Sequence, residues 1–171
     1  MPFFTKVRSF QLGMMILISA ILVLMFFDVS YHKKDVDEEI RVLIGSPYSL
    51  WDRLKMGGVG SQRFIVSGGN EALTALMEQS SSMHFCNIEL RQKGVVVWFR
   101  IKLDNYALAI PYHLLSVQKS DNQLRLMGGE WKVILTPANN ARLDNRFILK
   151  MMGKKAGESN SWSPGSNPTN I

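Results

Sequence analysis

Cysteine is almost absent from this sequence: Cys86 is the single thiol among 171 residues. One cysteine cannot form an intrachain disulfide, and it supplies neither a CxxC motif nor a cysteine-rich zinc cluster. Disulfide-stapled scaffolds and zinc ribbons are therefore excluded. A second long apolar run is also lacking, which excludes a polytopic transporter. With 46% hydrophobic and 20% charged residues, the composition is that of a folded protein and not of a disordered or collagen-like chain.

A phosphate-binding loop is absent as well. Glycines cluster at 57–60, 68–69 and 128–129. None of these clusters carries the Lys-Ser/Thr pair that the GxxxxGK[ST] motif requires between a strand and a helix. We interpret all three clusters as turns.

The longest apolar run covers residues 10–27 and contains no charged residue. As a helix it would span roughly 27 Å at about 1.5 Å per residue, close to the ~30 Å hydrocarbon core of a bilayer. Apolar side chains occupy every face of such a helix, whereas a core helix usually keeps a polar stripe. We predict a transmembrane helix over 10–27 after a basic N-terminus over 1–9. Its membrane-spanning residues include Phe10, Leu17, Leu22 and Phe27.

Two other interpretations of this run remain open. The first is a helix buried in a protein core. The second is a cleaved signal peptide, because Lys6 and Arg8 form a positive region ahead of the apolar residues. The residues that follow, 28–34, contain no A-x-A-like cleavage site. An uncleaved anchor is therefore favoured.

Three segments follow the apolar run. In residues 28–59 apolar positions recur at helical spacing from Val36 to Ile44, which predicts a juxtamembrane helical linker. Residues 40–155 hold sixteen basic and eight acidic residues, and 60–155 form the predicted domain. Residues 156–171 are dominated by Ser, Asn, Gly and Pro, and they have too few apolar groups to offset the entropy of ordering. We predict a disordered tail there.

The domain begins with short mixed elements and continues as strands. Asn70 is a plausible N-cap for a helix over 71–79. From Met83 onward the hydrophobic period is two, and short strands alternate with turns up to residue 135, which predicts an antiparallel meander. After Pro137 the period becomes helical, with Asn139 or Asn140 as cap and Gly153 as the end. The predicted class is α+β, with this amphipathic helix closing the meander or barrel.

The order of elements over 60–155 resembles the pleckstrin-homology-like fold of small bacterial membrane-associated proteins. The resemblance rests on the segment 87–117, on the hairpins after it and on the helix over 140–152. The phrase at 109–117, AIPYHLLSV, is similar to a strand–turn–strand step in such domains. The helix at 71–79 departs from the pattern and puts barrel closure in question. The resemblance implies a binding or scaffolding role without catalysis, although a fold alone does not determine function.

Basic residues are the candidate binding groups. One group surrounds the hairpin at 92–94 and another lies on the last helix: Arg91, Lys93, Arg100, Lys102, Arg146 and Lys150. Such residues attract anionic lipid headgroups or an acidic protein partner. A merely solvated basic face explains them equally well. Nucleic acid is not favoured, because the neighbouring Trp98, Phe99 and Tyr106 form no stacking motif.

A cysteine–histidine enzyme is the second class of function. His84 and Cys86 are two residues apart and would point to the same side of a strand, and His113 could approach from a neighbouring strand. Such a pair activates a thiol nucleophile, and the same three residues could hold a metal. A buried cysteine acting as a small hydrophobe is the simpler interpretation. We expect no catalytic residues, no metal and no cofactor.

These observations combine into one expectation. The chain is predicted to be a single-pass protein of the inner cell membrane, integral to the lipid bilayer, with a non-catalytic binding or scaffold domain. The basic domain, the lone thiol and the resemblance favour a cytoplasmic domain. Lys6 and Arg8 ahead of the span favour the opposite orientation. The sequence does not predict an oligomeric state.

Overall fold

The structure is a computed structural model that describes residues 25–30 and 34–161. Eight strands form one sheet in the order β1-β5-β4-β3-β2-β8-β7-β6, and all neighbouring strands are antiparallel. The strands are β1 Phe26–Asp28, β2 Phe64–Gly69, β3 Phe85–Leu90, β4 Gly94–Ile101, β5 Asp104–Pro111, β6 Ser116–Ser120, β7 Gln123–Gly128 and β8 Trp131–Pro137. The helices are α2 Lys34–Ile44, α3 Leu50–Lys55, α4 Glu71–Glu78 and α5 Asn145–Ser161, with a 3-10 turn at Ala138–Asn140.

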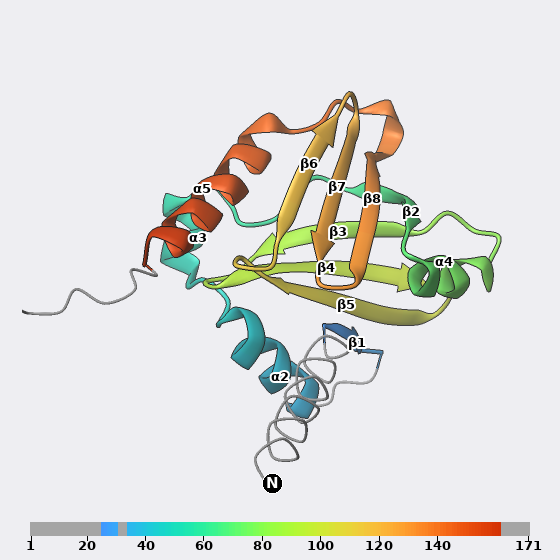
Figure 1. Cartoon of the computed structure of the whole chain (residues 1–171), viewed down its shortest axis with the longest axis horizontal. Helices are drawn as coiled ribbons and strands as arrows, with labels where there is room; N and C mark the ends of the chain where they lie inside the picture. The colour runs from blue at the N-terminus through green and yellow to red at the C-terminus, as the bar shows by residue number, and fades with distance from the viewer. Residues whose placement is uncertain (1–24, 31–33, 162–171) are drawn as a thin grey trace, which may run out of the picture.

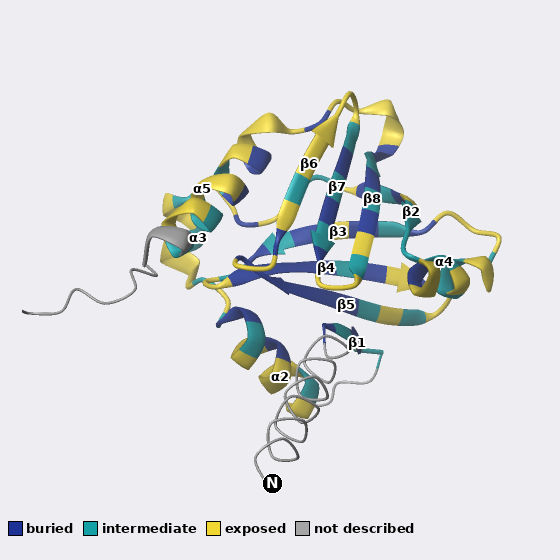
Figure 2. Cartoon of the chain, viewed as in Figure 1, coloured by how far each residue is buried: buried dark blue, intermediate teal, exposed yellow. Residues whose placement is uncertain are grey.

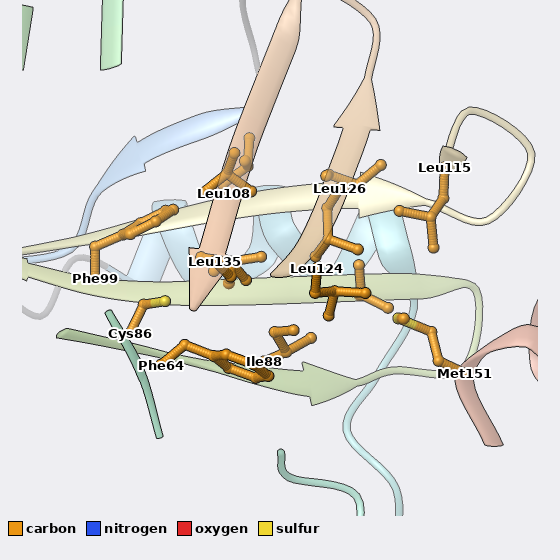
Figure 3. Packing of buried hydrophobic residues seen from close by; sticks show 14 of the residues in the cluster. Phe64, Cys86, Ile88, Phe99, Leu108, Leu115, Leu124, Leu126, Leu135 and Met151 are labelled. Atoms are coloured by element: carbon orange, nitrogen blue, oxygen red, sulfur yellow. The ribbon is translucent and has the colours of Figure 1, made fainter. Parts of the chain in front are cut away.

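The sheet folds over itself and encloses the main core. In Figure 1 the strands β6, β7 and β8 cross steeply over β3, β4 and β5. The strand alternation directs one apolar set inward, and Figure 3 shows Ile88, Leu108, Leu126 and Leu135 meeting between the two layers. Met151 of α5 also enters this core and is fully buried. The core therefore lies on the inner face of the sheet, and α5 contributes to its closure.

The outer face of β4 and β5 is covered by α2. Ile40 and Ile44 pack there against Val96, Ala107 and Ala109, and together with Phe27 they form a second buried cluster. The alanines are small, so the helix can lie close to the strands. Gly94 has the same effect, because a Cβ there would be 2.5 Å from the carbonyl oxygen of Ile110 and 2.6 Å from Ile44. The apolar side of the helix that the spacing of residues 36–44 predicts therefore packs against a sheet.

The N-terminal part of the predicted fold is wrong. Phe26 and Phe27 form a strand that pairs with Leu108 and Ala107 of β5, so they do not belong to a helix over 10–27. Within residues 25–30 and 34–161 no helix is long and apolar enough to cross a membrane. Residues 10–24, including Phe10, Leu17 and Leu22, lie outside the described residues. The predicted transmembrane helix and the single-pass inner-membrane localisation are both contradicted.

The physical reason lies in what β1 contacts. The ring of Phe26 stacks on Trp131 at 4.6 Å and on Tyr106 at 5.3 Å between centroids. Met25 is buried in the main core, and Phe27 is buried in the cluster beneath α2. Hydropathy measures the tendency of a side chain to leave water, and a protein core satisfies that tendency as well as a lipid does.

The C-terminal helix also differs from its predicted bounds. Asn139 and Asn140 have positive φ values of 57° and 53° within a 3-10 turn, so they do not start the helix. Asp144 does so, because its Oδ1 accepts from the backbone N–H groups of Arg146 and Phe147 at 2.9 and 3.3 Å. α5 continues through Gly153 to Ser161, into the predicted tail. Residues 162–171 of that tail lie outside the described part of the chain.

Candidate functional site

α2 covers only part of the outer face, and a concavity of about 470 Å³ lies beside it. Its lining residues come from three strands, from α2 and from the segments after β1 and before β2: Val29, Asp37, Arg63, Phe85, Cys86, Asn87, Trp98, Phe99, Arg100 and Asn105. We call this feature the outer-face concavity. It is the region in which polar and aromatic side chains of the outer face remain accessible.

The strand register explains why these residues lie together. In β3 and β4 the core-facing residues include Cys86 and Phe99, so the alternate residues face outward. Asn87 lies opposite Trp98. Arg100 lies opposite Asn105 of β5. The period-two pattern therefore brings two amides, an indole and a guanidinium onto one patch of the sheet.

Two arginines face this patch. Arg63 precedes β2, and its guanidinium carbon lies 4.2 Å from the centroid of the Phe85 ring. Arg63 and Arg100 are both exposed, and neither forms an ion pair with a described residue. Asp37, in the first turn of α2, is the acidic residue of the lining. The arginines thus keep donor groups available at the surface of the concavity.

Glu89 fixes the floor of the concavity by holding Trp98. The indole Nε1 donates to Glu89 Oε2 at 3.1 Å. The other carboxylate oxygen lies 3.3 Å from Arg91 Nε and 3.4 Å from Arg53 Nη2. Two guanidinium groups therefore balance the charge of Glu89, and the indole ring has a defined orientation. An ordered aromatic surface loses little entropy when a flat group stacks on it.

The arrangement is chemically suited to an anionic group on a flat apolar body. A guanidinium binds carboxylate or phosphate oxygens through paired N–H donors. The carboxamides of Asn87 and Asn105 can donate to the same oxygens. Trp98 and Phe85 supply aromatic faces beside these donors.

The six basic residues predicted from the sequence do not form one cluster. Arg91 and Lys93 lie at one end of β4, whereas Arg100 and Lys102 lie at the other end. Arg91 is largely buried against Glu89. Arg146 is exposed on α5, and Lys150 Nζ donates to the carbonyl oxygens of Gly58 and Gly57 at 2.7 and 3.4 Å. Of the six, only Arg100 lines the outer-face concavity.

Arg63 was missed by the sequence reasoning. It lies next to a strand that is distant in sequence from β4, so only the tertiary pairing of β2 with β3 brings it to Phe85. The sequence does indicate that Asn87, Trp98 and Arg100 face outward. They alternate with the core residues of β3 and β4, and that alternation is visible in the sequence.

The cysteine and histidines do not form an activated nucleophile. Cys86 faces the core (Figure 3), and burial raises the pKa of its thiol well above the ordinary value. His84 is buried and its Nε2 lies 3.0 Å from the carbonyl oxygen of Met77. His113 is exposed in the turn after β5. The thiol therefore stays protonated at neutral pH, and neither imidazole has a hydrogen bond to it.

A metal site is not formed by the described residues either. In that part of the chain no three His, Cys, Asp or Glu side chains lie close enough to hold an ion. Comparisons with known proteins add no assignment: no protein-family model, no curated protein and no solved structure matches this chain.

Proposed function

We propose that this protein is a non-catalytic binding module that takes an anionic group, a carboxylate or a phosphate on a flat apolar body, in the outer-face concavity. The observation that carries the proposal is the pair Arg63 and Arg100. Both guanidinium groups border one concavity with an aromatic floor, and neither has an acidic partner among the described residues.

The proposed binding depends on arginines that form no ion pair within the described part of the fold. Arg53 and Arg91 are paired with Glu89 and contribute to the local structure. Arg63 and Arg100 have no such ion pair with a described residue, and a charge-assisted hydrogen bond from each to a ligand oxygen would contribute about 1.5–3 kcal/mol. The specificity for a flat body comes from Trp98, because its indole is already oriented by Glu89.

The proposed function is non-catalytic because the single thiol is buried. Cys86 lines the concavity but is 2% exposed and protonated at neutral pH. Among the described residues of that lining, the acid is Asp37 and there is no histidine. These groups provide no pair of general acid and base.

Isothermal titration calorimetry of the full chain tests the proposal. The probes are phenyl phosphate, benzoate and inorganic phosphate, and we expect both aromatic anions to bind more tightly than inorganic phosphate. Arg63→Gln and Arg100→Gln should each weaken phenyl phosphate by about tenfold or more. Arg146→Gln removes the same charge from exposed α5 and should leave the affinity unchanged. Equal losses in all three variants, or no loss in any, would refute the proposal.

A further inference from the structure

A second surface lies around α3, at the other end of β4 from Arg100. Three large apolar side chains of this short helix point into solvent: Leu50, Trp51 and Leu54 are 77%, 74% and 73% exposed. Figure 2 shows the exposed residues on α3, next to α5. We call these three residues, together with Lys55, Lys150 and Lys154, the α3 surface.

The helix is held firmly although its apolar face is uncovered. Ser49 caps it by accepting from the backbone N–H of Asp52 at 3.2 Å and donating to the Asp52 carboxylate at 2.6 Å. Arg53 donates to the carbonyl oxygen of Tyr48 at 3.0 Å and pairs with Glu89 at 3.4 Å. Tyr48 and Met56, on either side of the helix, pack against the main core. The exposed side chains are therefore displayed on a fixed support.

Lysines surround both ends of this helix. Lys154 Nζ lies 5.1 Å from the centroid of the Tyr48 ring, before the helix begins. Lys150 Nζ is bound to the carbonyl oxygens of Gly57 and Gly58, after the helix ends. Neither ammonium group is ion-paired with a described residue, and Lys55 is exposed on the helix itself. The charge around the apolar side chains is therefore predominantly positive.

We infer that the α3 surface docks peripherally onto an anionic lipid surface. Leucine and tryptophan side chains enter the boundary between headgroups and acyl chains, while lysines remain at the level of the headgroup phosphates. Juxtaposed lysines are attracted by anionic headgroups. A stable protein interface needs about 800 Å² on each partner, which three side chains on a six-residue helix do not provide. The combination of few apolar residues and several lysines fits a lipid surface better.

Site-directed fluorescence tests this inference with the full chain. Leu54→Cys and the control Leu103→Cys each carry an environment-sensitive fluorophore, and native Cys86 is too buried to be labelled. Leu103 is 82% exposed in the turn between β4 and β5, so the two positions are matched in accessibility. Each labelled protein is titrated with phosphatidylcholine vesicles, with and without phosphatidylglycerol.

We expect the fluorescence at position 54 to rise at least about twofold on the anionic vesicles and to stay unchanged on neutral ones, with no rise at position 103. Because the readout is local, another segment that brings the chain to the vesicle does not mimic it. The inference is overturned by no rise at position 54, by equal rises at both positions, or by equal rises on both vesicle types. If the fluorescence at position 54 rose with protein concentration in the absence of vesicles, the α3 surface would bind a second copy of the chain, and the inference would be overturned.

The lysines are tested separately from the apolar residues. Lys55→Gln with Lys154→Gln should shift the titration midpoint to about 25-fold higher vesicle concentration, because each lysine near an anionic leaflet contributes about fivefold. Lys119→Gln with Lys132→Gln removes the same charge away from α3 and should leave the midpoint in place. Equal shifts in the two pairs would overturn the assignment of the α3 surface.

Discussion

The two faces of the sheet differ in how completely they are covered. Every strand from β2 to β5 contributes apolar residues to the inner face, where β7, β8 and α5 close the core. On the outer face α2 covers Val96, Ala107 and Ala109 but leaves the row around Trp98 and Arg100 accessible. The covered residues of β4 and β5 are small or aliphatic, whereas the accessible ones are aromatic, basic or amide side chains. The difference separates residues that stabilise the fold from residues that are available for a ligand.

The largest effect should come from the inner face. Phe147 of α5 is buried in the main core, and Phe147→Ala should reduce the free energy of unfolding by about 3–5 kcal/mol. Urea denaturation measures this loss. Leu149→Ala, an exposed residue on the same helix, should change stability by less than about 0.5 kcal/mol. Equal effects of the two substitutions would mean that α5 does not pack on the core through Phe147.

The covered half of the outer face should contribute less. Ile40→Ala in α2 removes a side chain from the smaller cluster and should cost about 2–3 kcal/mol. Val42→Ala, on the exposed side of the same helix, serves as the control and should be nearly neutral. If the unfolding midpoint of the Ile40 variant matched that of the Val42 variant, α2 would not be part of the folded unit.

Alkaline pH should lower the free energy of unfolding through two groups that are buried at the inner face. Burial raises the pKa of the Cys86 thiol above its ordinary value of 9.0. The pKa of Tyr112 is raised above its ordinary value of 10.0, first by burial and then by the nearby Tyr48 and Glu158. Above pH 9 the unfolded chain therefore releases protons that the folded chain retains, and stability falls with rising pH. The slope approaches about 1.4 kcal/mol per pH unit for each group.

Denaturation curves measured at a series of alkaline pH values follow this decline. Cys86→Ala should make the slope between the ordinary values of the two groups shallower, because the thiol ionises in the unfolded chain at lower pH than the phenol. Well below pH 9 neither group should contribute appreciable pH dependence. An unchanged alkaline slope in the alanine variant would show that Cys86 is not desolvated in the folded protein.

The smallest effect on stability should come from the uncovered half of the outer face. Arg100 is exposed and its side chain has no hydrogen bond or ion pair with a described residue, so Arg100→Gln should change the free energy of unfolding by less than about 0.5 kcal/mol. Thermal unfolding followed by circular dichroism is sufficient to detect a larger change. A loss of 2 kcal/mol or more, on the order of a buried-residue effect, would remove the distinction between the two halves of this face.

Local patterns in the sequence predicted much of the sheet, because period-two alternation has the same cause in β3 and β4 as in any half-buried strand. The apolar run ending at Phe27 was misassigned, since hydropathy does not distinguish a bilayer from the space beside β5. The cap Asp144 was hidden because three earlier asparagine and proline positions gave equally good local signals. These errors share one cause: the outcome depended on packing with residues distant in sequence.

The candidate site shows the same limit. Trp98 and Arg100 could be recognised as outward-facing from the alternation alone, and Arg100 was among the predicted basic residues. Arg63 and the ion-paired Glu89 depend on the β2–β3 pairing and on the position of α3. The predicted grouping of Arg91 with Arg100 failed because an eight-residue strand separates them. Spacing in sequence predicts which face a residue occupies, whereas it does not predict which neighbours it meets there.

Arginine side-chain signals provide the most direct measurement of the central claim, that the outer-face concavity binds an aromatic anion. The Nε–H resonances of arginine and the indole N–H resonances of tryptophan are recorded for the full chain during a titration with phenyl phosphate, and they are assigned through the Arg63→Gln, Arg100→Gln and Arg146→Gln variants. The account predicts saturable shifts of Arg63, Arg100 and Trp98, with Arg146 unmoved. Shifts of Arg146 as large as those of Arg63 and Arg100, or no saturable shift at Trp98, would contradict it.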